Sequence, residues 1–279
     1  MALEMIGTSL NLGEIGNGGP RAKVSAAETR NELPVGPWGV PDGVDCPECH
    51  NGGIITVRDE KGNLWGRECK CMARRRSNLM LERSGLKDML NRYTFDSFQS
   101  REKWQRDAKQ AAQRYAENPA DWFLTAGASG TGKTHLCTAI CGKLIESGIE
   151  TRYLLWRDMA ARAKATVGKD EGGYTSIVEP LKKVRALYID DLFKVGRERD
   201  RYTGEWRQMT PTAGDISLAF EIINARYCDR SKLTIISTEL SFPELMDVDE
   251  ALGSRIYERC KAGGLLRMEN RKNWRLGEA

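Results

Sequence analysis

Two hydrophobic periods alternate along the chain from about residue 118 onward. Short apolar runs predict buried strands, and between them apolar residues recur every three or four positions, as on the buried face of a helix. Strands that alternate with helices form parallel sheets covered by helices on both faces, so the pattern predicts an α/β fold. The predicted strands cover residues 122–125, 153–155, 186–191, 233–237 and 265–268, the predicted helices cover 135–147, 157–167, 213–226, 242–252 and 254–261, and 168–173 is a predicted loop.

The chain before residue 118 shows a different pattern. Its first part is rich in Gly, Asn and Pro and has neither period, which indicates a disordered tail or an arm that orders on a partner. Two short strands around a Gly-containing turn, 54–57 and 64–65, predict a hairpin. We therefore expect four parts: a disordered tail (1–45), a small module with a basic helix (46–85), a linker and helix (86–117) and the α/β domain (118–279).

A phosphate-binding loop joins the first strand and helix of the α/β domain. The segment Gly-Ala-Ser-Gly-Thr-Gly-Lys-Thr, residues 127–134, has the spacing in which backbone N–H groups wrap a phosphate without a Cβ in the way. Lys133 supplies a positive charge for the β- and γ-phosphates, the Thr134 hydroxyl reaches Mg²⁺, and the helix N-terminus favours an anion. The residues predicted to contact the nucleotide are Gly127, Ser129, Gly130, Thr131, Gly132, Lys133 and Thr134.

Paired acids follow a later apolar strand, in the segment Tyr-Ile-Asp-Asp that ends at residue 191. Downstream of a phosphate loop, the first acid of such a pair holds Mg²⁺ and the second polarises the attacking water as general base. We assign these roles to Asp190 and Asp191, with an incidental turn as the alternative. No Asn-Lys-x-Asp base-reading motif occurs, which favours ATP over GTP as the nucleotide.

Four of the eight cysteines lie close together, at Cys46, Cys49, Cys69 and Cys71. Random placement would put about one cysteine in a window of this length, so the cluster indicates a site. The hairpin between the two pairs would bring four thiolates together in the tetrahedral arrangement that Zn²⁺ prefers. Four reduced thiols without a metal are the alternative, although so short a segment lacks a core that could hold it folded.

Composition narrows the classes of function only slightly. The chain of 279 residues is 40% hydrophobic and 29% charged, and its net charge of +4 permits nucleic-acid contact without demanding it. No apolar run is long enough to cross a membrane and the N-terminus lacks a secretory signal, so we expect a cytoplasmic protein. Residues 194–208 mix basic and aromatic side chains, a composition typical of single-stranded nucleic-acid contacts as well as of a solvated loop.

Four motifs characterise the α/β domain: Gly-Ala-Ser-Gly-Thr-Gly-Lys-Thr-His-Leu, Tyr-Ile-Asp-Asp-Leu, Thr-Ile-Ile-Ser-Thr-Glu-Leu and Leu-Gly-Ser-Arg-Ile-Tyr-Glu-Arg. Taken together, they resemble those of the AAA+ ATPases that load replicative helicases, of the DnaC/DnaI type, and of their transposition relatives of the IstB type. The cysteine module and the following basic helix resemble those of phage and prophage loaders. The resemblance implies that residues 118–279 form an AAA+ P-loop ATPase domain.

The resemblance also implies roles for individual residues. Ser237 and Thr238 would form a polar sensor that binds the nucleotide, and Arg255 would be an arginine finger, with Arg259 as second choice. Such a finger acts on the nucleotide of a neighbouring subunit, which implies self-association through the AAA+ domains. This chain departs from the family at Glu239, where many relatives have Asn, and Arg275 is a candidate cis sensor.

The implied function is ATP-dependent delivery of a replicative DNA helicase onto single-stranded DNA. The implied cofactors are ATP, Mg²⁺ and Zn²⁺, and the Mg²⁺-dependent ATPase activity would be weak in an isolated subunit. The implied partners are the helicase, single-stranded DNA and other copies of the chain, with no membrane. Two alternatives stay open: a transposition ATPase of the IstB type, and an ATP-dependent adapter that does not hydrolyse ATP because of Glu239.

Overall fold

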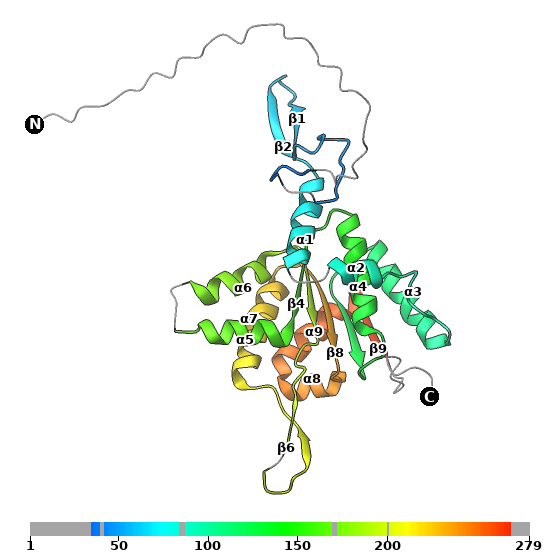
Figure 1. Cartoon of the computed structure of the whole chain (residues 1–279), viewed down its shortest axis with the longest axis vertical. Helices are drawn as coiled ribbons and strands as arrows, with labels where there is room; N and C mark the ends of the chain where they lie inside the picture. The colour runs from blue at the N-terminus through cyan, green and yellow to red at the C-terminus, as the bar shows by residue number, and fades with distance from the viewer. Residues whose placement is uncertain (1–34, 40–41, 84–86, 169–171, 200, 269–279) are drawn as a thin grey trace, which may run out of the picture. The chain divides into compact units, whose positions relative to one another are not determined.

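The computed structural model describes residues 35–39, 42–83, 87–168, 172–199 and 201–268 (Figure 1). Most of the expected tail, 1–45, and the candidate cis sensor Arg275 lie outside these residues. No described helix is long and apolar enough to cross a membrane.

Strands and helices alternate from residue 123 onward, as the hydrophobic pattern predicts. A short hairpin of β6 (Arg197–Arg199) and β7 (Trp206–Gln208) interrupts the alternation. The other elements are β3 (Phe123–Gly127), α4 (Lys133–Glu146), β4 (Thr151–Leu155), α5 (Trp156–Thr166), α6 (Gly173–Lys183), β5 (Ala186–Asp190), α7 (Ala213–Cys228), β8 (Leu233–Thr238), α8 (Phe242–Val248), α9 (Glu250–Gly263) and β9 (Gly264–Met268). The five predicted strands and five predicted helices of this domain are confirmed.

The five strands form one parallel sheet in the order β4-β5-β8-β3-β9. Strand β8 lies between β3, which precedes the phosphate loop, and β5, which precedes the paired acids. Parallel strands end at the same edge of a sheet, where ligands of α/β folds bind. The strand order therefore brings the ends of β3, β8 and β5 together at that edge.

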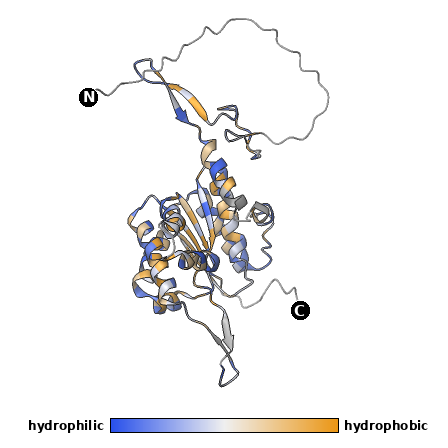
Figure 2. Ribbon diagram, turned by 60° about the vertical axis from the view of Figure 1, so that its left-hand side comes forward, coloured by the Kyte–Doolittle hydropathy of each residue, from blue (hydrophilic) through white to orange (hydrophobic). Residues whose placement is uncertain are grey.

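Hydrophobic clusters cover both faces of the sheet. Successive strand residues point to opposite faces, and accordingly Phe123 belongs to the cluster beneath α4 while Leu124 belongs to the cluster beneath α5 and α7. Helix α3 (Lys103–Glu117) packs beside α4, and α2 (Lys87–Arg92) also contacts α4. Figure 1 shows these three helices on one side of the sheet and α5, α6 and α7 on the other, and Figure 2 shows hydrophobic residues on the central strands.

Two helices were not predicted. Helix α6 contains Pro180 and begins just after a polar loop, two features that break the helical pattern in the sequence. Its last turns are nevertheless held to the core, because Val178 and Leu181 are buried. Tertiary packing thus supplies the stability that the local sequence does not. Helix α2 is only six residues long, too short for its period to be read.

The cysteine module consists of an antiparallel hairpin followed by a helix. Strands β1 (Ile54–Arg58) and β2 (Leu64–Glu68) pair in register, and α1 (Cys71–Arg83) begins at the last of the four cysteines. The buried Arg75 joins this helix to the segment before the hairpin, since its guanidinium donates to Asp42, to the Val44 carbonyl and to the Asn51 side chain. The predicted hairpin and basic helix are confirmed.

Candidate functional site

The phosphate loop follows β3 and ends at the first residue of α4. Its glycines adopt backbone conformations that other residues rarely reach: φ is +146° at Gly127 and +96° at Gly132. A Cβ on Gly127 would collide with the carbonyl oxygen of Met268, and one on Gly132 would lie 2.8 Å from the Phe98 ring. The close approach of β9 and of the 93–98 segment therefore requires glycine at positions 127 and 132. This requirement adds to the one imposed by a phosphate that binds the loop N–H groups.

Lys133 folds back onto the loop. Its Nζ donates to the carbonyl oxygens of Gly127 and Ala128, both at 2.8 Å. Only 5% of the residue is exposed, and burial lowers the pKa of the ammonium group although three carboxylates lie nearby. A phosphate that enters the loop would give this charge a stronger partner than two neutral carbonyls.

A cavity of about 420 Å³ opens in front of the loop. Its walls come from the phosphate loop and the start of α4, from the ends of β4, β5 and β8, and from α2 and the residue after it. The described residues that line it are Met89, Tyr93, Ser129, Gly130, Gly132, Lys133, Thr134, His135, Tyr153, Leu155, Asp190, Asp191, Lys194 and Glu239. The volume falls in the range of small-molecule sites in proteins.

Asp190 is the centre of a hydroxyl network at the end of β5. Its Oδ1 accepts from the hydroxyls of Thr134 at 3.2 Å, Tyr188 at 2.6 Å and Ser237, and its Oδ2 accepts from Tyr153 at 3.2 Å. Adjacent oxygens in an octahedral Mg²⁺ shell lie about 3 Å apart. The hydroxyl of Thr134 and the carboxylate of Asp190 therefore fit the predicted magnesium site.

Asp191 follows in a strained conformation. Its φ of +54° lies in the left-handed region, which costs energy in residues other than glycine and is concentrated at functional sites. The backbone N–H donates to Ser237 Oγ at 2.9 Å, and Oδ2 accepts from Lys194 Nζ at 2.9 Å. The carboxylate lines the cavity next to Asp190, where a general base would have to stand.

Hydrogen bonds join the end of β8 to the end of β5. Ser237 and Thr238 are fully buried, and their hydroxyls donate to Asp190 and to the Leu192 carbonyl. The structure therefore joins both residues to the segment 190–192 and places Glu239 on the cavity wall. Lys194 Nζ also contacts Glu239 Oε1, at 2.9 Å.

Arg255 and Arg259 lie on the same helix in unlike surroundings. Arg259 has no exposed surface, and its guanidinium donates to Asp121, which argues against its use as an arginine finger. Arg255 is partly exposed, donates to Asn224 Oδ1 at 3.1 Å and stacks over the Phe220 ring. No arginine is among the described residues that line the cavity, so the structure does not bring Arg255 to the pocket of its own chain.

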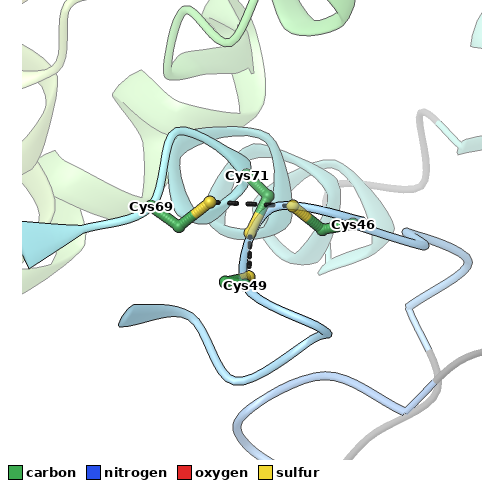
Figure 3. A group of neighbouring side chains, drawn as sticks. All are labelled: Cys46, Cys49, Cys69 and Cys71. Atoms are coloured by element: carbon green, nitrogen blue, oxygen red, sulfur yellow. Dashed lines mark hydrogen bonds between the residues drawn. The ribbon is translucent and has the colours of Figure 1, made fainter. Parts of the chain in front are cut away.

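The four cysteines of the N-terminal module converge on one point (Figure 3). Their Sγ atoms all lie within 4.8 Å of one another, with Cys46 and Cys69 3.6 Å apart and Cys49 and Cys71 3.5 Å apart. These separations are far longer than a disulfide bond and close to the roughly 3.8 Å between sulfurs around tetrahedral zinc. The Gly53 N–H donates to Cys49 Sγ at 3.3 Å, as in thiolate sites, so the group fits zinc.

Several residues in or next to the cavity received no role from the sequence. Tyr188 is fully buried and donates to Asp190; it shares a strand face with Asp190 two residues later, so period-two alternation could have revealed it. Tyr153 stands opposite Tyr188 in the register of β4 and β5, which no local pattern shows. Tyr93 and His135 stack on each other with ring centroids 4.9 Å apart. Lys194, three residues beyond Asp191, was predicted only as part of the basic and aromatic segment 194–208, and no pattern placed it in the cavity.

Comparison with known proteins adds a family match and several relatives. The profile of the IstB-like ATP binding proteins matches residues 55–262. The phage-like element PBSX protein XkdC of Bacillus subtilis is 28% identical over 229 residues, which cover 77% of this chain and 79% of that protein. The replicative helicase loader DnaC of Buchnera aphidicola is 32% identical over 148 residues, which cover 50% of this chain and 58% of the loader.

A solved structure agrees in fold. The crystal structure of the DnaC helicase loader superimposes with a TM-score of 0.51 over 66% of this chain and 99% of that chain, at 22% identity. At this identity the likeness shows the fold alone.

Proposed function

From the premise that this chain belongs to the family of IstB-like ATP-binding proteins, we propose that it is a Mg²⁺-dependent ATPase that loads a replicative DNA helicase onto single-stranded DNA. The observation that carries the ATPase assignment is the single cavity shared by Lys133, Thr134, Asp190 and Asp191. The helicase assignment is supported by the similarity to helicase loaders.

Each side chain of the cavity has a task in phosphoryl transfer. The loop N–H groups and Lys133 bind the β- and γ-phosphates, and Thr134 and Asp190 would hold Mg²⁺, which neutralises phosphate charge when bound. Asp191 would orient a water molecule and accept its proton as the water attacks the γ-phosphorus. Ser237 holds the two acids in place, because its hydroxyl donates to Asp190 and accepts from the backbone of Asp191.

Completion of the site by a second subunit accounts for the position of Arg255. Its partly exposed guanidinium is anchored on α7 and lies outside the described lining of its own cavity. In a head-to-tail assembly it would stabilise the charge that develops on the neighbour's γ-phosphate. ATP hydrolysis would then be slow in an isolated subunit and would report on assembly.

The N-terminal module would serve as the binding region for the helicase. The four cysteines fit a structural zinc ion, which would stabilise a hairpin too small to fold alone. Residues 194–208 are the proposed contact to single-stranded DNA, on the strength of their basic and aromatic composition. The strands β6 and β7 both lie within this segment and pair with each other.

Copurification with the replicative helicase of the host tests the loader role. We expect the tagged full-length chain to retain the helicase in the presence of Mg²⁺ and ATP, and Lys133→Ala to retain much less, because it cannot bind the triphosphate. Absence of a complex with ATP would remove the loader assignment. Retention of a transposase with duplex DNA in place of the helicase would favour the transposition ATPase, and a helicase complex without hydrolysis would favour the adapter.

Subunit mixing tests the arginine finger. Lys133→Ala and Arg255→Ala chains should each be inactive alone, whereas an equal mixture should regain about one quarter of the wild-type rate. The reason is that one interface in four would pair an intact Lys133 with an intact Arg255 if the finger acts between subunits. Arg230→Ala is the matched control and should keep its ATPase activity when it is assayed alone, since Arg230 is an exposed arginine that pairs with Glu258. An inactive mixture that still assembles would contradict action between subunits.

A further inference from the structure

The nucleotide cavity contains a second lysine that the assigned roles do not use. Lys194 follows β5 and lies on the cavity wall between two acids, with its Nζ 2.9 Å from Asp191 Oδ2 and 2.9 Å from Glu239 Oε1. Its side chain is 37% exposed, more than that of either acid. The ammonium group is thus held by its neighbours and still open to the cavity.

The charge balance of the cavity shows why a lysine is needed there. The described lining contains three carboxylates, Asp190, Asp191 and Glu239, against two lysines, Lys133 and Lys194. Magnesium can compensate Asp190, but Glu239 lies near Lys133, where phosphate would bind, and would repel it. Burial alone would raise the pKa of Glu239, yet Lys194 lowers it overall, so the carboxylate stays ionised at neutral pH.

Lys194 is also charged at neutral pH. Burial alone would lower its pKa, and the hydrogen bonds and charges of Glu239 and Asp191 more than reverse this, so that the pKa is raised overall. An ammonium group has three N–H donors. Within the described part of the chain two of these are taken by Asp191 and Glu239, which leaves one for a ligand without any loss of the two contacts.

From these contacts we infer that Lys194 is a second phosphate-binding residue of the cavity, which recognises the terminal phosphate of ATP and thereby distinguishes ATP from ADP. The inference rests on the proposed ATP site. Lys133 lies on the phosphate loop, whereas Lys194 stands beside Asp191, the proposed base, and so on the side where the terminal phosphate must lie for water to reach it. Glu239 and Asp191 act as positioning residues for this lysine.

The arrangement also explains how this chain can carry a glutamate at position 239. A lone carboxylate at the end of β8 would face the phosphates as a like charge, whereas the Lys194–Glu239 pair is neutral as a unit and still offers an N–H donor. The two residues lie in the segments that follow different strands, β5 and β8, which are neighbours in the sheet. We therefore expect the effects of changes at the two positions to depend on each other.

Nucleotide affinities of single and double variants test the inference. Calorimetry with Mg²⁺ would compare ADP with an ATP analogue whose β- and γ-phosphorus atoms are joined by a methylene group. Lys194→Met should weaken binding of the analogue about tenfold or more and change the ADP affinity less than threefold, because only the contact to the terminal phosphate is lost. Lys194→Arg, which keeps the charge, should retain part of the preference for the analogue.

The double variant separates a phosphate contact from simple charge compensation. If Lys194 binds the phosphate, Lys194→Met with Glu239→Gln should remain poor at distinguishing the analogue from ADP. If the double variant regains the wild-type ratio of the affinities for the analogue and for ADP, Lys194 only compensates the charge of Glu239 and the inference is overturned. An unchanged ratio of these affinities in Lys194→Met would also overturn it. Lys182→Met is the matched control, since Lys182 also bridges two carboxylates, Glu179 and Glu221, but lies on α6 away from the cavity.

A third result would contradict the proposed ATP site itself. A wild-type chain that binds neither nucleotide would overturn the ATP site and the role of Lys194 with it. Wild-type binding together with an unchanged ratio in Lys194→Met would overturn only the role of Lys194. Melting temperatures of all variants, compared with the Lys182→Met control, would show that any loss of affinity comes from the cavity and not from unfolding.

Discussion

Asp191→Asn should lower the rate of ATP hydrolysis by about 10²- to 10⁴-fold while ATP binding persists, because the amide cannot accept a proton from the attacking water. Binding should persist because the phosphate contacts come from the loop N–H groups, Lys133 and, by our inference, Lys194, which keeps its contact to Glu239 when Asp191 is changed. The backbone N–H of Asp191 bonds to Ser237, and this contact survives the substitution. The geometry of the strand end should therefore be preserved.

Steady-state hydrolysis and nucleotide affinity, measured side by side, check this expectation. Asp247→Asn is a matched control, since Asp247 is an exposed acid on α8 outside the described lining of the cavity. Lys133→Ala provides the opposite pattern, with loss of binding as well as turnover. Unchanged hydrolysis in Asp191→Asn would remove Asp191 as the base, and loss of ATP binding would show that its carboxylate mainly positions Lys194.

Cys69→Ser should abolish binding of zinc and unfold the N-terminal module. The purified wild-type chain should contain one zinc ion, and the variant almost none, because three thiolates and a hydroxyl are a poor zinc site. Binding of zinc to small modules stabilises the fold by about 10 kcal/mol or more, far beyond what a two-stranded hairpin provides. Hydrogen exchange over residues 46–71 should therefore become fast in the variant.

Metal analysis by atomic emission and hydrogen exchange would check this result. Cys228→Ser is the control, because Cys228 is an exposed cysteine at the end of α7 and lies far from the cluster in sequence. If the wild-type chain contains no zinc and still shows slow hydrogen exchange over residues 46–71, the four cysteines are reduced thiols without a metal. ATP affinity should change little in Cys69→Ser, since no described residue of the module lines the nucleotide cavity.

Local patterns predicted most of the ATPase domain. The strands and helices of this domain were predicted because their apolar residues repeat with the period of a strand or of a helix. The phosphate loop was predicted because its residues are consecutive in the sequence. Helix α6 was missed for the opposite reason. Its proline and polar start disfavour a helix, and only the burial of Val178 and Leu181 in the hydrophobic core compensates.

The candidate site was predicted in part, and the limit lies where contacts join different strands. Ser237 stays a predicted nucleotide contact, and the structure adds that its hydroxyl donates to Asp190 and that Glu239 lies on the cavity wall. Arg259 was a second choice for a finger, yet it is buried against Asp121. Neither outcome could be read from spacing, because both depend on which element packs beside which.

By itself, the sequence determined the alternation of strands and helices, the phosphate loop, the paired acids and the clustering of four cysteines, since each is written in neighbouring or regularly spaced residues. Only the tertiary structure decided that β8 lies between β3 and β5 and that Lys194 bridges Asp191 and Glu239. Hydrogen bonds and ion pairs act over a few ångströms, so residues far apart in the chain acquire a shared function only when the order of the strands makes them neighbours.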